Sequence, residues 1–165
     1  MQRRKKGQIA GQVFIYIMAV IVVGGIALIG YSAIKNILSK SCDAEKANFK
    51  SDLDLMIEKY TSYGSVNKKM LSVPCDYTSV CFVDGSMIGK PLGDCQNRVI
   101  GDAAASGTEQ NIFVISNKQT IGIGYSPLIS LPSGQQNNCT CISVENSNFY
   151  ITFNGKGSSV EISAG

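Results

Sequence analysis

The pattern of apolar residues divides the chain into two parts near Gly64. From Gly7 to Ile34 there are 28 consecutive residues without a charge. An α-helix rises about 1.5 Å per residue, so this stretch covers roughly 42 Å, more than a bilayer's hydrocarbon core of about 30 Å. The pattern predicts one transmembrane helix over residues 8–34. The run is longer than that of a secretory signal peptide and continues into a helical pattern, so we expect it to remain in the mature protein.

The helical period continues beyond the predicted span. Apolar residues recur at steps of three and four, and no Pro or Gly interrupts them before Gly64, which predicts one helix from about Gln8 to Ser62. Residues 35–63 would be its extracellular continuation. The apolar stripe, which requires a cover, consists of Ile34, Ile37, Leu38, Ala44, Ala47, Leu53, Met56, Ile57 and Tyr60. We interpret the opposite face as solvated rather than catalytic, and it carries Lys46, Lys50, Asp52, Asp54, Glu58 and Lys59.

Residues 64–165 have the pattern of an antiparallel β domain. Short β-rich runs are separated by Pro, Gly, Asn and Ser, and they lie at 68–73, 79–83, 111–116, 119–125, 140–145, 149–153 and 158–162. Asn154-Gly155 is typical of a hairpin turn, and residues 98–105 are consistent with a short helix. Gly122-Ile-Gly124 lacks the third glycine and the helix of a nucleotide loop, so it indicates a bulge or a close backbone approach. The chain is therefore expected to adopt an α+β fold in which the long helix packs on this sheet.

Composition and charge exclude several classes of function. The sequence has no His and no Trp, so the commonest general base and metal ligand are absent, and we expect neither enzymatic activity nor a cofactor. The net charge of +3 comes from a basic run at the N-terminus, because removing its four residues from 15 Lys+Arg leaves 11 against 12 Asp+Glu. We therefore expect no nucleic-acid partner. That run, Arg3, Arg4, Lys5 and Lys6, predicts a cytoplasmic N-terminus and an extracellular C-terminal domain.

All six cysteines follow the predicted span, in the compartment where disulfides persist. They are Cys42, Cys75, Cys81, Cys95, Cys139 and Cys141. Three bridges are the favoured interpretation. A thiolate metal site is the alternative, but the C-x2-C spacing and the histidine that zinc sites commonly have are absent. A bridge between Cys139 and Cys141 would close a strained small ring, so each is expected to pair with a distant cysteine.

Asn138-Cys139-Thr140 fits the N-glycosylation pattern, which is meaningful only on an exported surface. The pattern is short and arises often by chance. An unmodified loop asparagine is therefore an equally good interpretation of Asn138.

The residues Lys5-Lys6-Gly7-Gln8-Ile9-Ala10-Gly11-Gln12, followed by the apolar helix, resemble the class III signal peptide of archaeal type IV pilin-like proteins. The resemblance implies that residues 1–7 are a leader, cut by a prepilin peptidase between Gly7 and Gln8. Weaker likeness to small single-span proteins of this type lies in residues 63–66, 74–75 and 80–84. Gln12 stands at the fifth mature position, where many pilins have glutamate. As an assembly contact it can hydrogen-bond a neighbour's amino terminus but not form a charged pair with it.

Two classes of function follow. The first is a structural subunit, major or minor, of a type IV pilus-like filament or pseudopilus, with copies of itself or related subunits as partners. Glycines and alanines in the span permit the close helix packing that this requires, although glycine is in any case frequent in transmembrane helices. The second is a membrane-anchored extracellular domain, residues 64–165, that binds a partner without polymerising.

Overall fold

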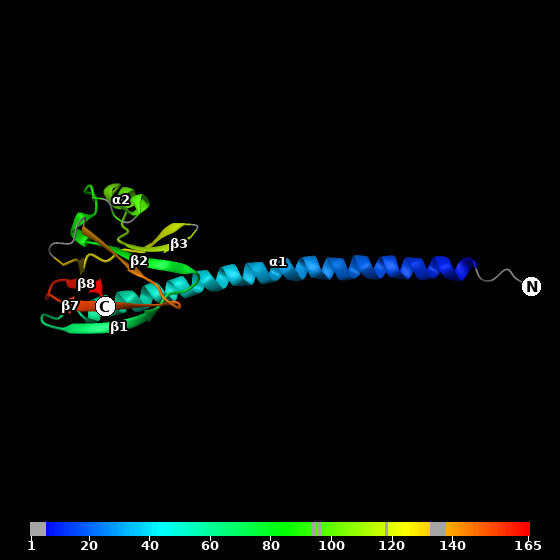
Figure 1. Cartoon of the computed structure of the whole chain (residues 1–165), viewed down its shortest axis with the longest axis horizontal. Helices are drawn as coiled ribbons and strands as arrows, with labels where there is room; N and C mark the ends of the chain where they lie inside the picture. Colours follow the sequence, from blue (N-terminus) through cyan, green and yellow to red (C-terminus); the bar gives the residue numbers. More distant parts are fainter. Residues whose placement is uncertain (1–5, 94, 96, 118, 133–137) are drawn as a thin grey trace, which may run out of the picture. The chain divides into compact units, whose positions relative to one another are not determined.

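The computed structural model describes residues 6–93, 95, 97–117, 119–132 and 138–165, with the backbone alone for residues 6–11, 38 and 39. The chain forms two compact units, Met1–Ser41 and Cys42–Gly165. The long helix α1, Lys6–Lys59, contributes its first part to one unit and its last part to the other. The expected α+β layout, a long N-terminal helix followed by a mainly antiparallel sheet domain, is confirmed (Figure 1).

The first unit is helical throughout its described residues. Gly24, Gly25 and Gly30 lie inside α1 without interrupting it. Each glycine destabilises a helix by up to about 1 kcal/mol relative to alanine. Three glycines in this short stretch therefore lower the stability of the helix, unless they allow another helix to pack closely against it.

The last part of α1 is an integral element of the second unit. Phe49, Leu53 and Ile57, spaced by four residues, lie on one face of the helix and are buried. The helix ends at Lys59, three residues before the predicted end. Thr61 Oγ1 donates a hydrogen bond of 2.9 Å to the carbonyl of Glu58, and Gly64 adopts φ +79° before the first strand. The chain therefore leaves the helix earlier than its apolar periodicity indicates.

Among the described residues, eight strands form two four-stranded sheets, where a single sheet was expected. The first sheet has the order β1 (Val66–Ser72), β7 (Asn148–Gly155), β8 (Val160–Ala164) and β5 (Ile129–Ser130). The second has the order β4 (Thr120–Gly124), β3 (Ile112–Ser116), β2 (Tyr77–Val83) and β6 (Cys139–Ser143). All pairs are antiparallel except β5–β8, which is parallel. The sequence prediction missed β5 because two residues are too few to show a periodicity.

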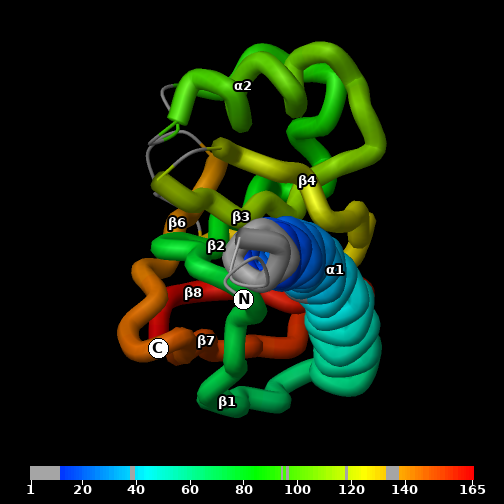
Figure 2. The backbone as a smooth tube through the Cα atoms, turned by 90° about the vertical axis from the view of Figure 1, so that its right-hand side faces the viewer, coloured from blue at the N-terminus to red at the C-terminus, as the bar shows by residue number. Residues whose placement is uncertain are grey.

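The main core lies where α1 and both sheets meet. Phe49 packs edge-on against Phe149 of β7 with ring centroids 6.2 Å apart, and Tyr60 stacks on Phe153 at 5.5 Å. The second sheet is also covered on its other face by α2, Arg98–Ala105, with Ile100 and Ala104 fully buried (Figure 2). This short helix has the predicted bounds, and the Asn97 side chain caps it by accepting from the Val99 amide.

The hairpin prediction at residues 149–162 is correct, but the predicted turn is wrong. Asn154 and Gly155 belong to β7 and pair with β8, and the turn follows them, where the Lys156 amide donates to the Ser159 carbonyl. Gly155 is required for a different reason. Its amide donates to the Ser65 carbonyl, and a Cβ there would collide with the Ser62 carbonyl oxygen.

The Gly122-Ile-Gly124 prediction is confirmed. Ile112 of β3 pairs with Gly124 while the next residue, Phe113, pairs with Gly122, so β4 contains a bulge at Ile123. A Cβ on Gly124 would also lie 2.8 Å from Cε of Lys50 on α1, which is the close approach that glycine permits.

Candidate interaction surface

The apolar part of α1 is the strongest candidate for a functional surface. Its large side chains are exposed within their unit: Val23 is 65% exposed, Leu28 75% and Ile29 73%. Apart from the helix's own backbone, no atom lies within 4 Å of where a Cβ would stand on Gly24, Gly25 or Gly30. Among the described residues one helix, α1, is long and apolar enough to cross a membrane, judged by length and composition. A surface of this kind requires lipid or other protein to cover it.

The last two residues of the predicted leader lie at the start of this helix. Arg3, Arg4 and Lys5 are outside the described residues, whereas Lys6, Gly7 and Gln8 form the beginning of α1. Cleavage between Gly7 and Gln8 stays a prediction. Gln12, the expected assembly contact, is exposed, so its amide is accessible to a neighbouring molecule.

All six cysteines form disulfides, in agreement with the sequence prediction, and the pairing that sequence could not choose is now defined. Cys81 and Cys141 face each other across β2 and β6, and their Cα atoms are 4.0 Å apart. Cys95 pairs with Cys139. Both bridges belong to the smaller core beneath α2. Cys81–Cys141 joins two neighbouring strands, and Cys95–Cys139 links β6 to the chain three residues before α2, where apolar burial is limited. With every cysteine in a bridge, the alternative thiolate metal site is left without ligands.

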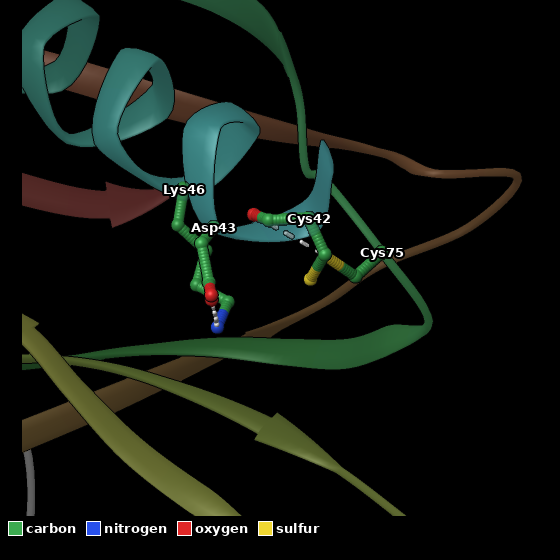
Figure 3. A network of polar contacts seen from close by, with 4 residues as sticks. All are labelled: Cys42, Asp43, Lys46 and Cys75. Carbon is green, nitrogen blue, oxygen red and sulfur yellow. Dashed lines mark hydrogen bonds and ion pairs between the residues drawn. A yellow bond between two sulfur atoms is a disulfide. The ribbon is translucent and has the colours of Figure 1, made fainter. Parts of the chain in front are cut away.

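The third bridge fastens α1 to the sheet domain. It joins Cys42, the first residue of the second unit, to Cys75 in the connection between β1 and β2 (Figure 3). One turn further, Lys46 Nζ donates to Asp43 Oδ1 at 2.8 Å, and this hydrogen bond is the main cause that raises the pKa of the Lys46 ammonium. The Asp43 side chain is 70% exposed, so the ion pair is screened by water and the disulfide is the stronger of the two links.

The outer face of α1 in the second unit is less uniformly solvated than the sequence predicted. Lys50, Asp52 and Glu58 are exposed, as expected, but Asp54 is half-buried. Asp54 Oδ1 is buried and has no hydrogen-bond partner within the part of the chain that the structure describes. Burial raises the pKa of the Asp54 carboxyl, and Glu58 raises it further, whereas the Lys50 charge lowers it. The sequence does not predict the burial of Asp54, because this residue lies four positions from Lys50 and four from Glu58, both of which are exposed.

Asn138 stands immediately before β6. It is exposed and adopts φ +51°, in the left-handed region that asparagine tolerates. Its carbonyl accepts a hydrogen bond of 3.1 Å from the Asp84 amide, so its backbone is held while its side chain faces solvent. Glycosylation at Asn138 stays a prediction.

No family model, curated protein or solved structure matches this chain. Its function is therefore inferred from the residues and their arrangement.

Proposed function

We propose that this chain is a structural subunit, major or minor, of a type IV pilus-like surface filament or pseudopilus. In this proposal a prepilin peptidase removes residues 1–7, and the apolar part of α1 passes from the membrane into the core of a polymer. The sheet domain is then displayed outside, where its three disulfides are stable.

The observation that carries the proposal is that one helix serves both units. α1 exposes apolar side chains over residues 12–37, and the same helix then buries Phe49, Leu53 and Ile57 in the sheet domain. A span joined to its domain by a flexible linker would serve equally well as an anchor. In this chain the apolar segment and the helical turns that pack in the domain belong to the same helix, as expected of a subunit whose helix forms the core of a polymer.

The small residues of the apolar segment provide the first test. Helices in an apolar environment associate by close packing at small residues, so Gly25→Leu should block assembly. A Cβ at this position meets nothing within 4 Å apart from the helix's own backbone, and leucine makes the span more apolar, so membrane insertion should be unaffected. The measurement is the amount of filament sheared from cells, beside the amount of chain in the membrane fraction. Filaments in normal amount would contradict the proposal.

A charge in the same segment provides the second test. Val23→Asp should abolish filaments, because the apolar core of the helix bundle cannot solvate a carboxylate. Placing an aspartate at the centre of a transmembrane helix costs about 2.5–3.5 kcal/mol, which gives the size of this effect. The matched control is Val66→Asp on β1, since Val23 is 65% and Val66 64% exposed. We expect the control to retain filaments. Equal loss in both variants would show that the effect is not specific to the helix.

The alternative function is a membrane-anchored binding domain that does not polymerise. The observation that favours it is the length of the apolar segment, because the described part from Gln12 to Ile34 already covers about 34 Å and lipid alone can bury it. Replacing residues 8–34 by an unrelated apolar span separates the two functions. The anchored domain keeps its surface location and its binding in such a chimera, whereas the filament subunit loses assembly.

A further inference from the structure

The Cys42–Cys75 bridge stands ahead of the buried contacts that α1 makes in the second unit. Cys42 is the first residue of that unit, and Phe49, seven positions later, is the first residue of the unit that is buried. The bridge joins Cys42 to the connection between β1 and β2 (Figure 3). A pull that reaches the domain along α1 therefore meets a covalent bond before it meets the packed side chains of the core.

Without this bond, the pull would follow the chain into the weakest part of the first sheet. After α1 the chain enters β1, which stands at the edge of its sheet and pairs with β7. Most residues of β1 are exposed, and Leu71 is the one that is buried. Segments with few buried apolar contacts open at low cost. A pull along the chain would thus detach the last part of α1 and β1 first.

The bridge delivers the pull to a more strongly held strand. Cys75 lies two residues before β2, which is an interior strand with β3 on one side and β6 on the other. The four residues from Val80 to Val83 in β2 are all 0% exposed. Six positions after Cys75, the Cys81–Cys141 bridge joins β2 to β6. A pull from α1 therefore reaches the centre of the second sheet through two bridges and a short piece of backbone.

The segments that these two bridges enclose are outside this path. The Cα atoms of Cys42 and Cys75 are 5.8 Å apart and those of Cys81 and Cys141 are 4.0 Å apart, so a pull cannot separate the ends of either segment. The first segment contains the last part of α1 and β1, and the second contains α2, β3, β4 and β5. Cys95–Cys139 lies entirely within the second segment, so it is outside the path as well.

We propose that Cys42–Cys75 and Cys81–Cys141 act in series as a mechanical clasp, which carries tension from α1 to β2 past the last turns of the helix and the edge strand. Cys95–Cys139 stabilises the fold without carrying tension. This inference goes beyond the proposed function and does not depend on it, because a filament subunit and an anchored domain both receive a pull through α1.

Pulling single molecules between position 40 and the C-terminus tests the path. The full-length chain in mild detergent carries one handle on an azide-bearing amino acid in place of Lys40 and the other at its C-terminus, so the cysteines stay untouched. With the bridges closed, unfolding can extend only residues 75–81 and 141–165, which gives a released contour length of roughly 100 Å. A wild-type length that includes the 33 residues between Cys42 and Cys75 would overturn the proposal.

Two paired variants separate the clasp from general stabilisation. In Cys42→Ser, Cys75→Ser the first unfolding event should occur at a lower force, and the contour length should grow by about 115 Å because 33 more residues can extend. Cys95→Ser, Cys139→Ser is the matched control, since it also removes one bridge but outside the path. We expect it to keep the unfolding force and contour length of the wild type, although its melting temperature falls.

An unchanged first unfolding force in Cys42→Ser, Cys75→Ser, or a lower one in the control, would refute the clasp. Near-ultraviolet circular dichroism before pulling establishes that both variants are folded.

The wild-type chain, held at constant force in dithiothreitol, provides a measurement that needs no variant. A thiolate of this dithiol attacks a bridge under tension, so the bond between the two cysteines breaks, a mixed disulfide with the reductant forms, and the other cysteine leaves as a thiolate. Opening of Cys42–Cys75 should release a step of 33 residues, about 115 Å. The 44-residue step of Cys95–Cys139 should appear only after Cys81–Cys141 has opened. A 44-residue step as the first event would contradict the proposed path.

Discussion

Replacing Leu53 by alanine tests whether the last part of α1 belongs to the folded domain. Leu53 has no exposed surface and lies in the core shared with both sheets. Truncating a fully buried leucine costs about 3 kcal/mol, the sum of lost apolar transfer and the cavity that remains. A domain of this size has a urea m-value of about 1.5 kcal/mol/M, so the unfolding midpoint should fall by about 2 M.

Leu55→Ala is the matched control, two residues away on the same helix. Leu55 is 62% exposed, so its truncation should change the free energy of unfolding by less than about 0.5 kcal/mol. The measurement is urea unfolding of the full chain in mild detergent, followed by near-ultraviolet circular dichroism of the tyrosines. Near-ultraviolet signals report packing of the domain rather than helix content. Equal midpoints for the two variants would refute the packing of α1 in the core.

Three further predictions concern stability. Gly155→Ala should lower the free energy of unfolding by at least about 2 kcal/mol in the same assay, because the added Cβ would meet the Ser62 carbonyl and lie 2.6 Å from the Tyr60 carbonyl oxygen. The control is Gly101→Ala inside α2, where the Cβ enters open space, and it should raise the free energy of unfolding by up to about 1 kcal/mol. Asp54→Asn should raise the melting temperature at neutral pH. Burial raises the pKa of this carboxyl above the usual 3.8, so the ionised side chain lowers the stability of the folded protein fully at a pH above the folded-state pKa. The gain in melting temperature from asparagine should therefore fade as the pH falls and vanish below 3.8. Alkylation should label none of the six cysteines without reductant, and reduction should lower the melting temperature sharply, since each bridge contributes about 2–4 kcal/mol.

The sequence predicted the elements whose signal is local and long. The uncharged run after Gly7, the apolar spacing through Ile57 and the bounds of α2 could be read directly from periodicity. The bulge beside Gly124 was also predictable, because a glycine weakens the interior of a strand and commonly marks a bulge or a close approach of another backbone.

What the sequence did not predict depends on contacts between distant residues. Asn154-Gly155 has strong turn propensity, but Gly155 is held in β7 by hydrogen bonds with Gly64 and Ser65, so tertiary contacts override the local preference. The disulfide pairing likewise depends on the fold, because Cys81 and Cys141 face each other on β2 and β6, while the other two bridges join residues that are far apart in the sequence. Asp54 shares its helical spacing with solvated neighbours, and only the folded chain distinguishes it by burying one of its oxygens.

The filament proposal requires that the apolar helix is released from its basic leader and enters a polymer. Intact mass with N-terminal sequencing of the protein in filaments sheared from its own cells measures both steps at once. We expect a mature chain that begins at Gln8, and only membrane-bound precursor in a Gly7→Val variant. Recovery of the chain with Met1 and the basic leader intact, and only in the membrane fraction, would contradict the proposal.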